Sequence, residues 1–196
     1  MTEVDPGAVP VAPRKPRKIF LLIGCVVAAV LGIGLFTGIG TSPTTNNAPR
    51  VGGPVPAFST NRLNGSGTVT SATGSPTVLL FFGNWCVACH AELPPLATAV
   101  RQQDRAGGSL SRIHVIGIDN EDDVSRADSF IKSSGVTFPV GYDPNLAITE
   151  GDFYFRSDPE AVFVDANGTI DRIVIGQTLT PGTFTSDERD LIPSGS

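Results

Sequence analysis

Two kinds of hydrophobic pattern alternate along the middle of the chain. Residues 77–82 and 113–118 are continuous apolar runs, which are typical of strands buried on both faces of a sheet. Residues 86–103 and 121–134 instead carry apolar side chains three and four positions apart, which indicates helices with one buried face. The pattern therefore predicts a strand, a helix, a second strand and a second helix, in that order.

Shorter elements follow. Residues 137–140 are expected to form a short edge strand, and residues 145–153 a brief helix. Residues 160–165 and 169–175 predict two more strands, and the Asn167-Gly168 pair between them favours a tight hairpin turn. Strands that first alternate with helices and then form a hairpin predict an α/β domain with a mixed sheet flanked by helices.

These elements are expected to form one domain at residues 51–178, a size that a single hydrophobic core can support. Residues 179–196 are interpreted as a C-terminal tail. Pro181 and Gly182 leave room there only for a short helix around residues 186–191.

An uncharged apolar segment, residues 19–39, precedes the domain. At ~1.5 Å per residue, a helix of this length spans roughly 30 Å, the thickness of a bilayer's hydrocarbon core. We interpret it as one transmembrane helix, followed by a linker at residues 40–50. Basic residues lie just before it, so the positive-inside rule predicts a cytoplasmic tail at residues 1–18 and an extracytoplasmic domain. These basic residues are Arg14, Lys15, Arg17 and Lys18.

Two alternatives concern the processing of this segment. Gly38-Ile39-Gly40 is a poor match to a signal-peptide cleavage site. Leu22-Ile23-Gly24-Cys25 resembles a lipoprotein processing box, but the apolar run continues well beyond Cys25. We favour an uncleaved anchor, and lipidation of Cys25 would also leave the domain tethered to a membrane.

The charge of the exposed part excludes one class of partner. Of the 14 Lys and Arg and the 19 Asp and Glu residues, four and two lie before residue 41, which leaves ten basic and seventeen acidic residues. A chain this acidic cannot assemble the basic face that nucleic acids require. We therefore expect no nucleic-acid partner.

The main candidate for chemistry is the pair Cys86 and Cys89, at the exit of a predicted strand and the entry to a predicted helix. A thiol at a helix start is acidified by the helix dipole and by free backbone N–H groups, and an acidified thiol attacks disulfides. As a structural disulfide the pair would close a very short loop, which removes little entropy from the unfolded chain. The spacing therefore favours a redox role.

Three other readings of the motif remain open. Cys86-Val87-Ala88-Cys89-His90 also matches the attachment motif of c-type haem, with His90 as the iron ligand, but a buried strand before it and a Glu-x-Pro after it do not favour haem. Zinc would require His114 as a fourth ligand, although His114 lies in a predicted strand. The reactive cysteine of peroxiredoxins follows a Pro-x-x-x-Thr-x-x-Cys pattern. In this chain Gly83, not Thr, stands three residues before Cys86, so a peroxidase is disfavoured.

The segment from Val51 to Gly176 resembles the thioredoxin superfamily, and within it the membrane-anchored TlpA/ResA-like (redoxin-domain) thiol–disulfide oxidoreductases. The resemblance implies a thioredoxin-like fold. It rests on the Gly/Pro-rich lead-in at residues 51–58, on Trp85-Cys86-Val87-Ala88-Cys89 with the following Glu92-Leu93-Pro94, on Phe138-Pro139, and on Asp158-Pro159 before a strand that ends in Asp165-Ala166-Asn167-Gly168.

The resemblance assigns roles to the two cysteines and to Trp85. Cys86, with a partly exposed sulfur, is expected to attack the substrate disulfide, and Cys89 to resolve the mixed disulfide. Trp85 is expected to shape the docking surface. His90 is interpreted as a helix-surface residue.

Two further positions carry expected supporting roles. Pro159 matches the superfamily's cis-proline, which lies opposite the cysteines, but Asp158 replaces the usual apolar or Thr residue before it, and its charge would repel a thiolate. Glu92 matches an acidic residue that governs proton exchange, and a solvated first-turn glutamate is the alternative reading. Leu80 stands where the superfamily often has a buried Asp.

The sequence thus predicts an enzyme without a cofactor, tethered in a bacterial cell membrane, that reduces protein disulfides. The resemblance implies apocytochrome c as one substrate and a membrane thiol-transfer protein as the electron donor. The alternatives are a disulfide-forming oxidase of exported proteins, a peroxiredoxin-like antioxidant, and a non-enzymatic haem or binding domain.

Overall fold

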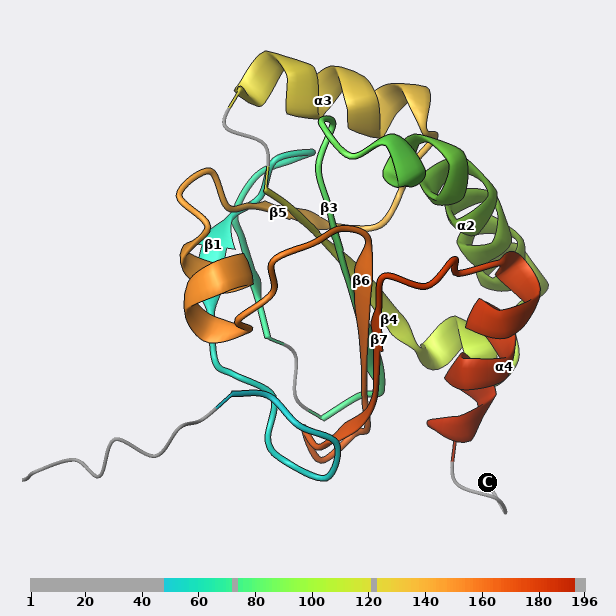
Figure 1. Cartoon of the computed structure of the whole chain (residues 1–196). Helices are drawn as coiled ribbons and strands as arrows, with labels where there is room; N and C mark the ends of the chain where they lie inside the picture. Colours follow the sequence, from blue (N-terminus) through green and yellow to red (C-terminus); the bar gives the residue numbers. More distant parts are fainter. Residues whose placement is uncertain (1–47, 72–73, 121–122, 193–196) are drawn as a thin grey trace, which may run out of the picture. The chain divides into compact units, whose positions relative to one another are not determined.

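A five-stranded mixed sheet forms the centre of the computed structural model, which describes residues 48–71, 74–120 and 123–192 (Figure 1). The strand order is β5-β4-β3-β6-β7, with β3 parallel to β4 and antiparallel to β6. The strands are β3 (Thr77–Phe82), β4 (His114–Asp119), β5 (Val140–Tyr142), β6 (Glu160–Val164) and β7 (Ile170–Ile175). The predicted α/β class and mixed sheet are confirmed.

The central strands lie where the apolar runs predict them. All residues of β3 are buried, as expected for a strand with neighbours on both edges and packed layers on both faces. The strand predicted at residues 137–140 is displaced, because β5 begins only at Val140. Pro139 has no backbone N–H, so the ladder of hydrogen bonds starts after it.

Three helices pack on one face of the sheet. They are α2 (Val87–Ala106), α3 (Val124–Ser133) and α4 (Pro181–Asp190), and they share a hydrophobic core with Val78, Leu80 and Phe82 of β3. In Figure 1, α2 and α4 lie beside each other. Cys86 and Cys89 belong to this core, so the cysteine pair is anchored by the same packing that joins the helices to the sheet.

The other face of the sheet is covered by short elements. Leu79 and Phe81 of β3 pack there against Phe153 and Phe155. Both phenylalanines come just after a single π-helical turn, η2 (Ala147–Asp152). The small hairpin of β1 (Ser59–Asn61) and β2 (Thr68–Thr70) completes this layer, and a short 3-10 helix, η1 (Leu110–Arg112), precedes β4. The brief helix predicted at residues 145–153 is thus present as η2.

The C-terminal region differs from its prediction. The sequence predicts a tail with a short helix at residues 186–191, whereas the structure contains α4 from Pro181 to Asp190, with Phe184 fully buried in the main core. Pro181 does not prevent this helix because it occupies the first turn, where a missing N–H costs nothing, and Thr180 caps the N-terminus. The domain therefore extends past residue 178.

The predicted transmembrane helix at residues 19–39 and Cys25 lie outside the described residues. Among the helices that the structure does describe, none combines the length and the apolar character that crossing a membrane requires.

Candidate active site

The turn between β3 and α2 positions the cysteine pair. Cys86 is the N-cap residue of α2, and Cys89 lies in its first turn. The two residues form a disulfide with their Cα atoms 5.2 Å apart, and the backbone N–H of Cys89 donates a hydrogen bond to Sγ of Cys86 at 3.1 Å. The first sulfur therefore occupies the place of a capping oxygen, where the helix dipole favours negative charge.

Cys86 is more buried than the sequence suggests. Cys86 is 4% exposed, so the expectation of a partly exposed sulfur is wrong for this disulfide form. The core that anchors α2 to β3 also surrounds Cys86. Its neighbours on the chain are exposed instead, with Trp85 at 56% and Val87 at 86%.

Trp85 is held at the surface by hydrogen bonding. Its indole Nε1–H donates to Oδ1 of Asn120 at 3.1 Å, and the amide Nδ2 of Asn120 donates to Oδ2 of Asp158 at 2.8 Å. Asn120 directly follows β4, and its own backbone N–H bonds to the carbonyl of Phe82. Three separate chain segments therefore meet beside the cysteines.

The peptide bond between Asp158 and Pro159 is cis. Pro159 lines a small cavity of about 20 Å³ together with Cys89, Glu92 and Leu80. The loop before β6 is thereby brought against Cys89.

Glu92 is also part of this cavity. It is 8% exposed, and its Oε2 accepts a hydrogen bond from the backbone N–H of Leu179 at 3.1 Å. The alternative reading of a solvated first-turn glutamate does not hold, since the side chain is buried in the second turn of α2. Leu80, where a superfamily member often has an Asp, forms part of the apolar lining.

Two carboxylates flank Pro159. Burial raises the pKa of Asp158 to about 6, and the hydrogen bond from Asn120 opposes this shift. Burial likewise raises the pKa of Glu160 to about 7; the hydrogen bond from Ser157 opposes this shift, whereas the charge of Asp158 adds to it. One oxygen of each carboxylate, Asp158 Oδ1 and Glu160 Oε2, is buried without a hydrogen-bond partner. Negative charge is therefore costly on both sides of the cis-proline.

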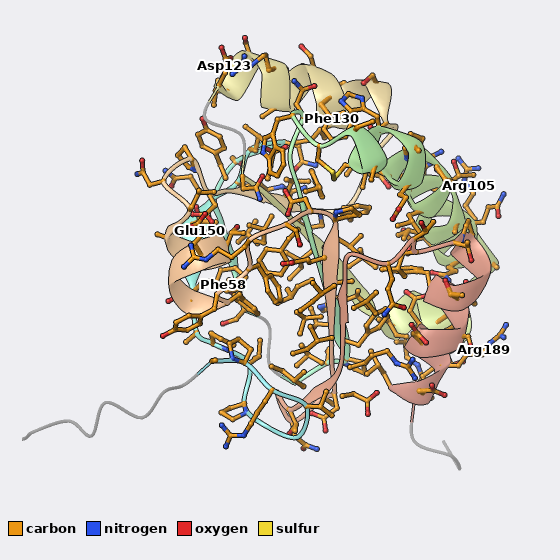
Figure 2. The ribbon with its side chains drawn as sticks, in the orientation of Figure 1. Phe58, Arg105, Asp123, Phe130, Glu150 and Arg189 are labelled. Atoms are coloured by element: carbon orange, nitrogen blue, oxygen red, sulfur yellow. A yellow bond between two sulfur atoms is a disulfide. The ribbon has the colours of Figure 1, made fainter. Side chains whose placement is uncertain are left out.

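His90 lies on the exposed side of α2, in keeping with the surface role expected for it. Its Nε2 bonds to the carbonyl oxygen of Asn84 at 2.8 Å. Its ring packs on Phe130 of α3, which Figure 2 labels, with the ring centroids 4.5 Å apart. His114 is exposed at the start of β4.

Sequence reasoning missed Asn120 and Glu160. Asn120 could have been found, because β3 and β4 are parallel and the residues after their carboxyl ends meet at one edge of the sheet. Glu160 occupies the first position of a predicted buried strand, where an acidic residue is unusual. The apolar residues that follow it dominate the pattern, so this position is easily overlooked.

The fold and the cysteine pair together define an enzyme class, that of thioredoxin-like thiol–disulfide oxidoreductases. The sequence model of the AhpC/TSA family matches residues 51–173. The chain belongs to this family.

Named relatives agree with this class. The chain is 30% identical over 162 residues to the thiol:disulfide interchange protein DsbE of Escherichia coli K12, a match that covers 80% of this chain and 83% of the relative. It is 23% identical over 186 residues to the thiol-disulfide oxidoreductase ResA of Oceanobacillus iheyensis, with 92% and 93% covered. The chain is therefore a thiol–disulfide oxidoreductase of the ResA/DsbE type.

A solved structure shows the same fold. A secreted Mycobacterium tuberculosis disulfide oxidoreductase, described as homologous to E. coli DsbE, superimposes with a TM-score of 0.59 at 24% identity, over 68% of this chain and 96% of the other.

Proposed function

We propose that this protein reduces disulfides in extracytoplasmic proteins through Cys86 and Cys89. The observation that carries the proposal is the disulfide at the N-terminus of α2, with Cys86 as the N-cap and the cis-proline loop against Cys89. This arrangement offers one sulfur stabilised as a thiolate and a second sulfur within bonding distance of the first.

The proposed reaction has two steps. The Cys86 thiolate attacks one sulfur of the substrate disulfide, which forms a mixed disulfide and releases the first substrate thiolate. Cys89, as a thiolate, then attacks the Cys86 sulfur, so the Cys86–Cys89 bond forms and the second substrate thiolate leaves. Two electrons pass to the substrate, whose two thiolates take up protons, and the enzyme ends oxidised.

Three neighbours take supporting roles in this proposal. Trp85 forms the exposed docking surface beside Cys86, and Pro159 offers a backbone edge to the substrate chain. Glu92 accepts the proton of Cys89 before the second step. The burial of the Glu92 carboxylate in the same small cavity as Cys89 supports this role.

The cellular setting extends the proposal. Residues 19–39 anchor the protein in a bacterial cell membrane as a single pass, with residues 1–18 in the cytoplasm and the redox domain outside. A membrane thiol-transfer protein returns Cys86 and Cys89 to the dithiol form. Apocytochrome c is one substrate in this account. The apolar, uncharged character of residues 19–39 and the basic residues before them support the anchor.

Trapping experiments test the assignment of the two cysteines. The variant Cys89→Ser cannot resolve the first intermediate, so it is expected to accumulate mixed disulfides with its substrates that disappear on addition of dithiothreitol. Cys86→Ser is the matched control and is expected to accumulate few. Equal trapping by both variants would show that Cys86 is not the attacking residue.

A further inference from the structure

Asp158 departs from the family pattern, and it lies at the end of a hydrogen-bonded chain. From Trp85 the chain runs through Asn120 to Asp158, with donor–acceptor distances of 3.1 and 2.8 Å. Each residue comes from a different segment: the turn before α2, the end of β4, and the loop before β6. Asp158 is therefore linked to the Trp85 indole through Asn120.

The direction of the hydrogen bonds follows from the chemistry of the groups. An ionised carboxylate only accepts hydrogen bonds, so it takes the Nδ2 end of the Asn120 amide. The Oδ1 end of the same amide must then face Trp85, whose indole N–H only donates. The carboxylate of Asp158 thus determines which end of Asn120 is presented to the indole.

The surroundings make Asn120 a suitable intermediate. Asn120 is buried, and its backbone N–H is fixed by a hydrogen bond of 3.0 Å to the carbonyl of Phe82. At Gly83, an added Cβ would lie 2.5 Å from Oδ1 of Asn120 and closer still to Nε1 of Trp85. Glycine at this position therefore allows the indole and the amide to meet.

Packing alone holds Trp85 weakly. More than half of its surface is exposed, so the hydrogen bond to Asn120 is a main restraint on its orientation. A side chain that is already ordered loses less conformational entropy when a partner binds than one that moves freely.

We propose that Asp158 is a positioning residue for substrate docking: through Asn120 it fixes the Trp85 indole beside the Cys86–Cys89 pair. This inference rests on the proposed function only in taking Trp85 as part of the docking surface. It adds that the residue before the cis-proline orients that surface.

The first test follows the indole itself, and Trp85 is the only tryptophan of the chain. In the full chain, Asp158→Ala is expected to increase the acrylamide quenching of its fluorescence, as is Asn120→Ala, which removes the intermediate. The double variant is expected to show no more quenching than Asn120→Ala alone, because both changes break one chain. Asp158→Asn keeps an acceptor for Asn120 and is expected to stay near wild type. Asp171→Ala, at an exposed position of β7, is the matched control.

The second test follows docking. For the mixed disulfide of a cysteine-containing peptide with glutathione, Asp158→Ala is expected to raise KM about three- to tenfold relative to Asp158→Asn, which lacks the same charge, with kcat nearly unchanged between the two. Asn120→Ala is expected to raise KM by a similar factor relative to wild type, with kcat nearly unchanged. The reaction with hydroxyethyl disulfide, which is too small to need the indole, is expected to run at the same rate in Asp158→Ala as in Asp158→Asn, and at the wild-type rate in Asn120→Ala. Asp158→Asn is expected to retain the wild-type KM.

Several results would overturn the inference. These are additive effects of Asp158→Ala and Asn120→Ala, an equal loss in Asp158→Asn and Asp158→Ala, or wild-type quenching and KM in Asp158→Ala. If the wild-type protein reduced neither disulfide, the proposed function would fail, while the fluorescence of the variants would still decide whether Asp158 positions Trp85.

Discussion

The backbone N–H of Cys89 donates a hydrogen bond to Sγ of Cys86 at 3.1 Å. The helix N-terminus thus directs a donor at the sulfur that would carry negative charge after reduction. The carboxylate of Asp158 acts in the opposite sense, because it adds negative charge to the same region. The balance between these two influences sets the thiolate fraction of Cys86.

Neutralising Asp158 is expected to increase that thiolate fraction. Asp158 connects to Trp85, the neighbour of Cys86, through two hydrogen bonds, and Pro159 beside it lines a cavity with Cys89. Removal of a like charge from the surroundings of the cysteine pair favours the thiolate, so Asp158→Asn should raise the ionisation constant of the Cys86 thiol about tenfold. The ultraviolet absorbance of the thiolate, followed against pH in the reduced protein, measures it.

Asp171→Asn removes the same charge from an exposed position of β7 and serves as the control. Its titration curve should match that of the wild-type protein. An unchanged curve for Asp158→Asn would mean that the field of Asp158 does not reach the sulfur.

The wild-type protein itself should respond to pH through Asp158. Its pKa of about 6, raised by burial, means that the carboxyl is mostly neutral below this pH and mostly charged above it. Glu160 faces the same proline loop and titrates near 7. The ratio of peptide reduction rates between Asp158→Asn and the wild type should therefore be nearer one at pH 5 than at pH 8. A ratio that does not vary with pH would count against a charge effect.

Glu92 is expected to matter for the second chemical step. Its buried carboxylate shares a small cavity with Cys89 and is held by the N–H of Leu179. Glu92→Gln keeps the shape and removes the proton acceptor, so resolution of the mixed disulfide should slow about tenfold to hundredfold. Rapid-mixing kinetics with a preformed peptide mixed disulfide on Cys86 measure this step.

Glu150→Gln is a matched change at a partly exposed position, where the ion pair with the exposed Arg156 contributes little. It should resolve the intermediate at the wild-type rate. Wild-type resolution in Glu92→Gln at every pH would remove Glu92 from the mechanism.

Buried Glu188 should make the stability of the domain depend on pH. It is fully buried on α4, Gln103 donates to its Oε2, and its Oε1 has no hydrogen-bond partner. Burial raises its pKa from 4.5 to about 7, so the folded protein binds more protons than the unfolded chain between these values. The contribution of neutral Glu188 to the free energy of unfolding is therefore complete below about pH 4.5 and is lost as the pH rises through about 7.

The variant Glu188→Gln cannot ionise, so it should unfold less readily than wild type at pH 8, with a gain on the order of 1 kcal/mol in the free energy of unfolding. At pH 4.5 the two proteins should differ much less. Urea unfolding at both values of pH measures the difference. Parallel stability curves for the two proteins would show that Glu188 does not carry the effect.

The sequence predicts well what depends on local patterns. β3 lies at the predicted residues, and Cys86 caps the predicted helix, because a continuous apolar run and a motif at a helix start are short-range signals. The hairpin at Asn167-Gly168 likewise follows from turn chemistry, and Asp165 accepts the N–H groups of Asn167 and Thr169.

What the sequence does not predict depends on contacts between distant residues. The hydrogen bonds from Trp85 through Asn120 to Asp158 join positions 35 and 38 residues apart. The burial of Glu92 likewise depends on the segment before α4, where the backbone N–H of Leu179 meets its carboxylate. Pro181 and Gly182 make the helix that follows this segment hard to predict from the sequence. These relationships appear only when the sheet brings the segments together.

The reduction potential of the Cys86–Cys89 pair tests the central claim most directly. Equilibration of the full chain in dithiothreitol and glutathione redox buffers, with the two redox forms separated by thiol alkylation and mass measurement, gives this potential. A reductase of the proposed kind should show a reversible two-electron transition near that of thioredoxin, about −270 mV. A potential near that of DsbA, about −120 mV, or the absence of any reversible disulfide between Cys86 and Cys89, would contradict the account.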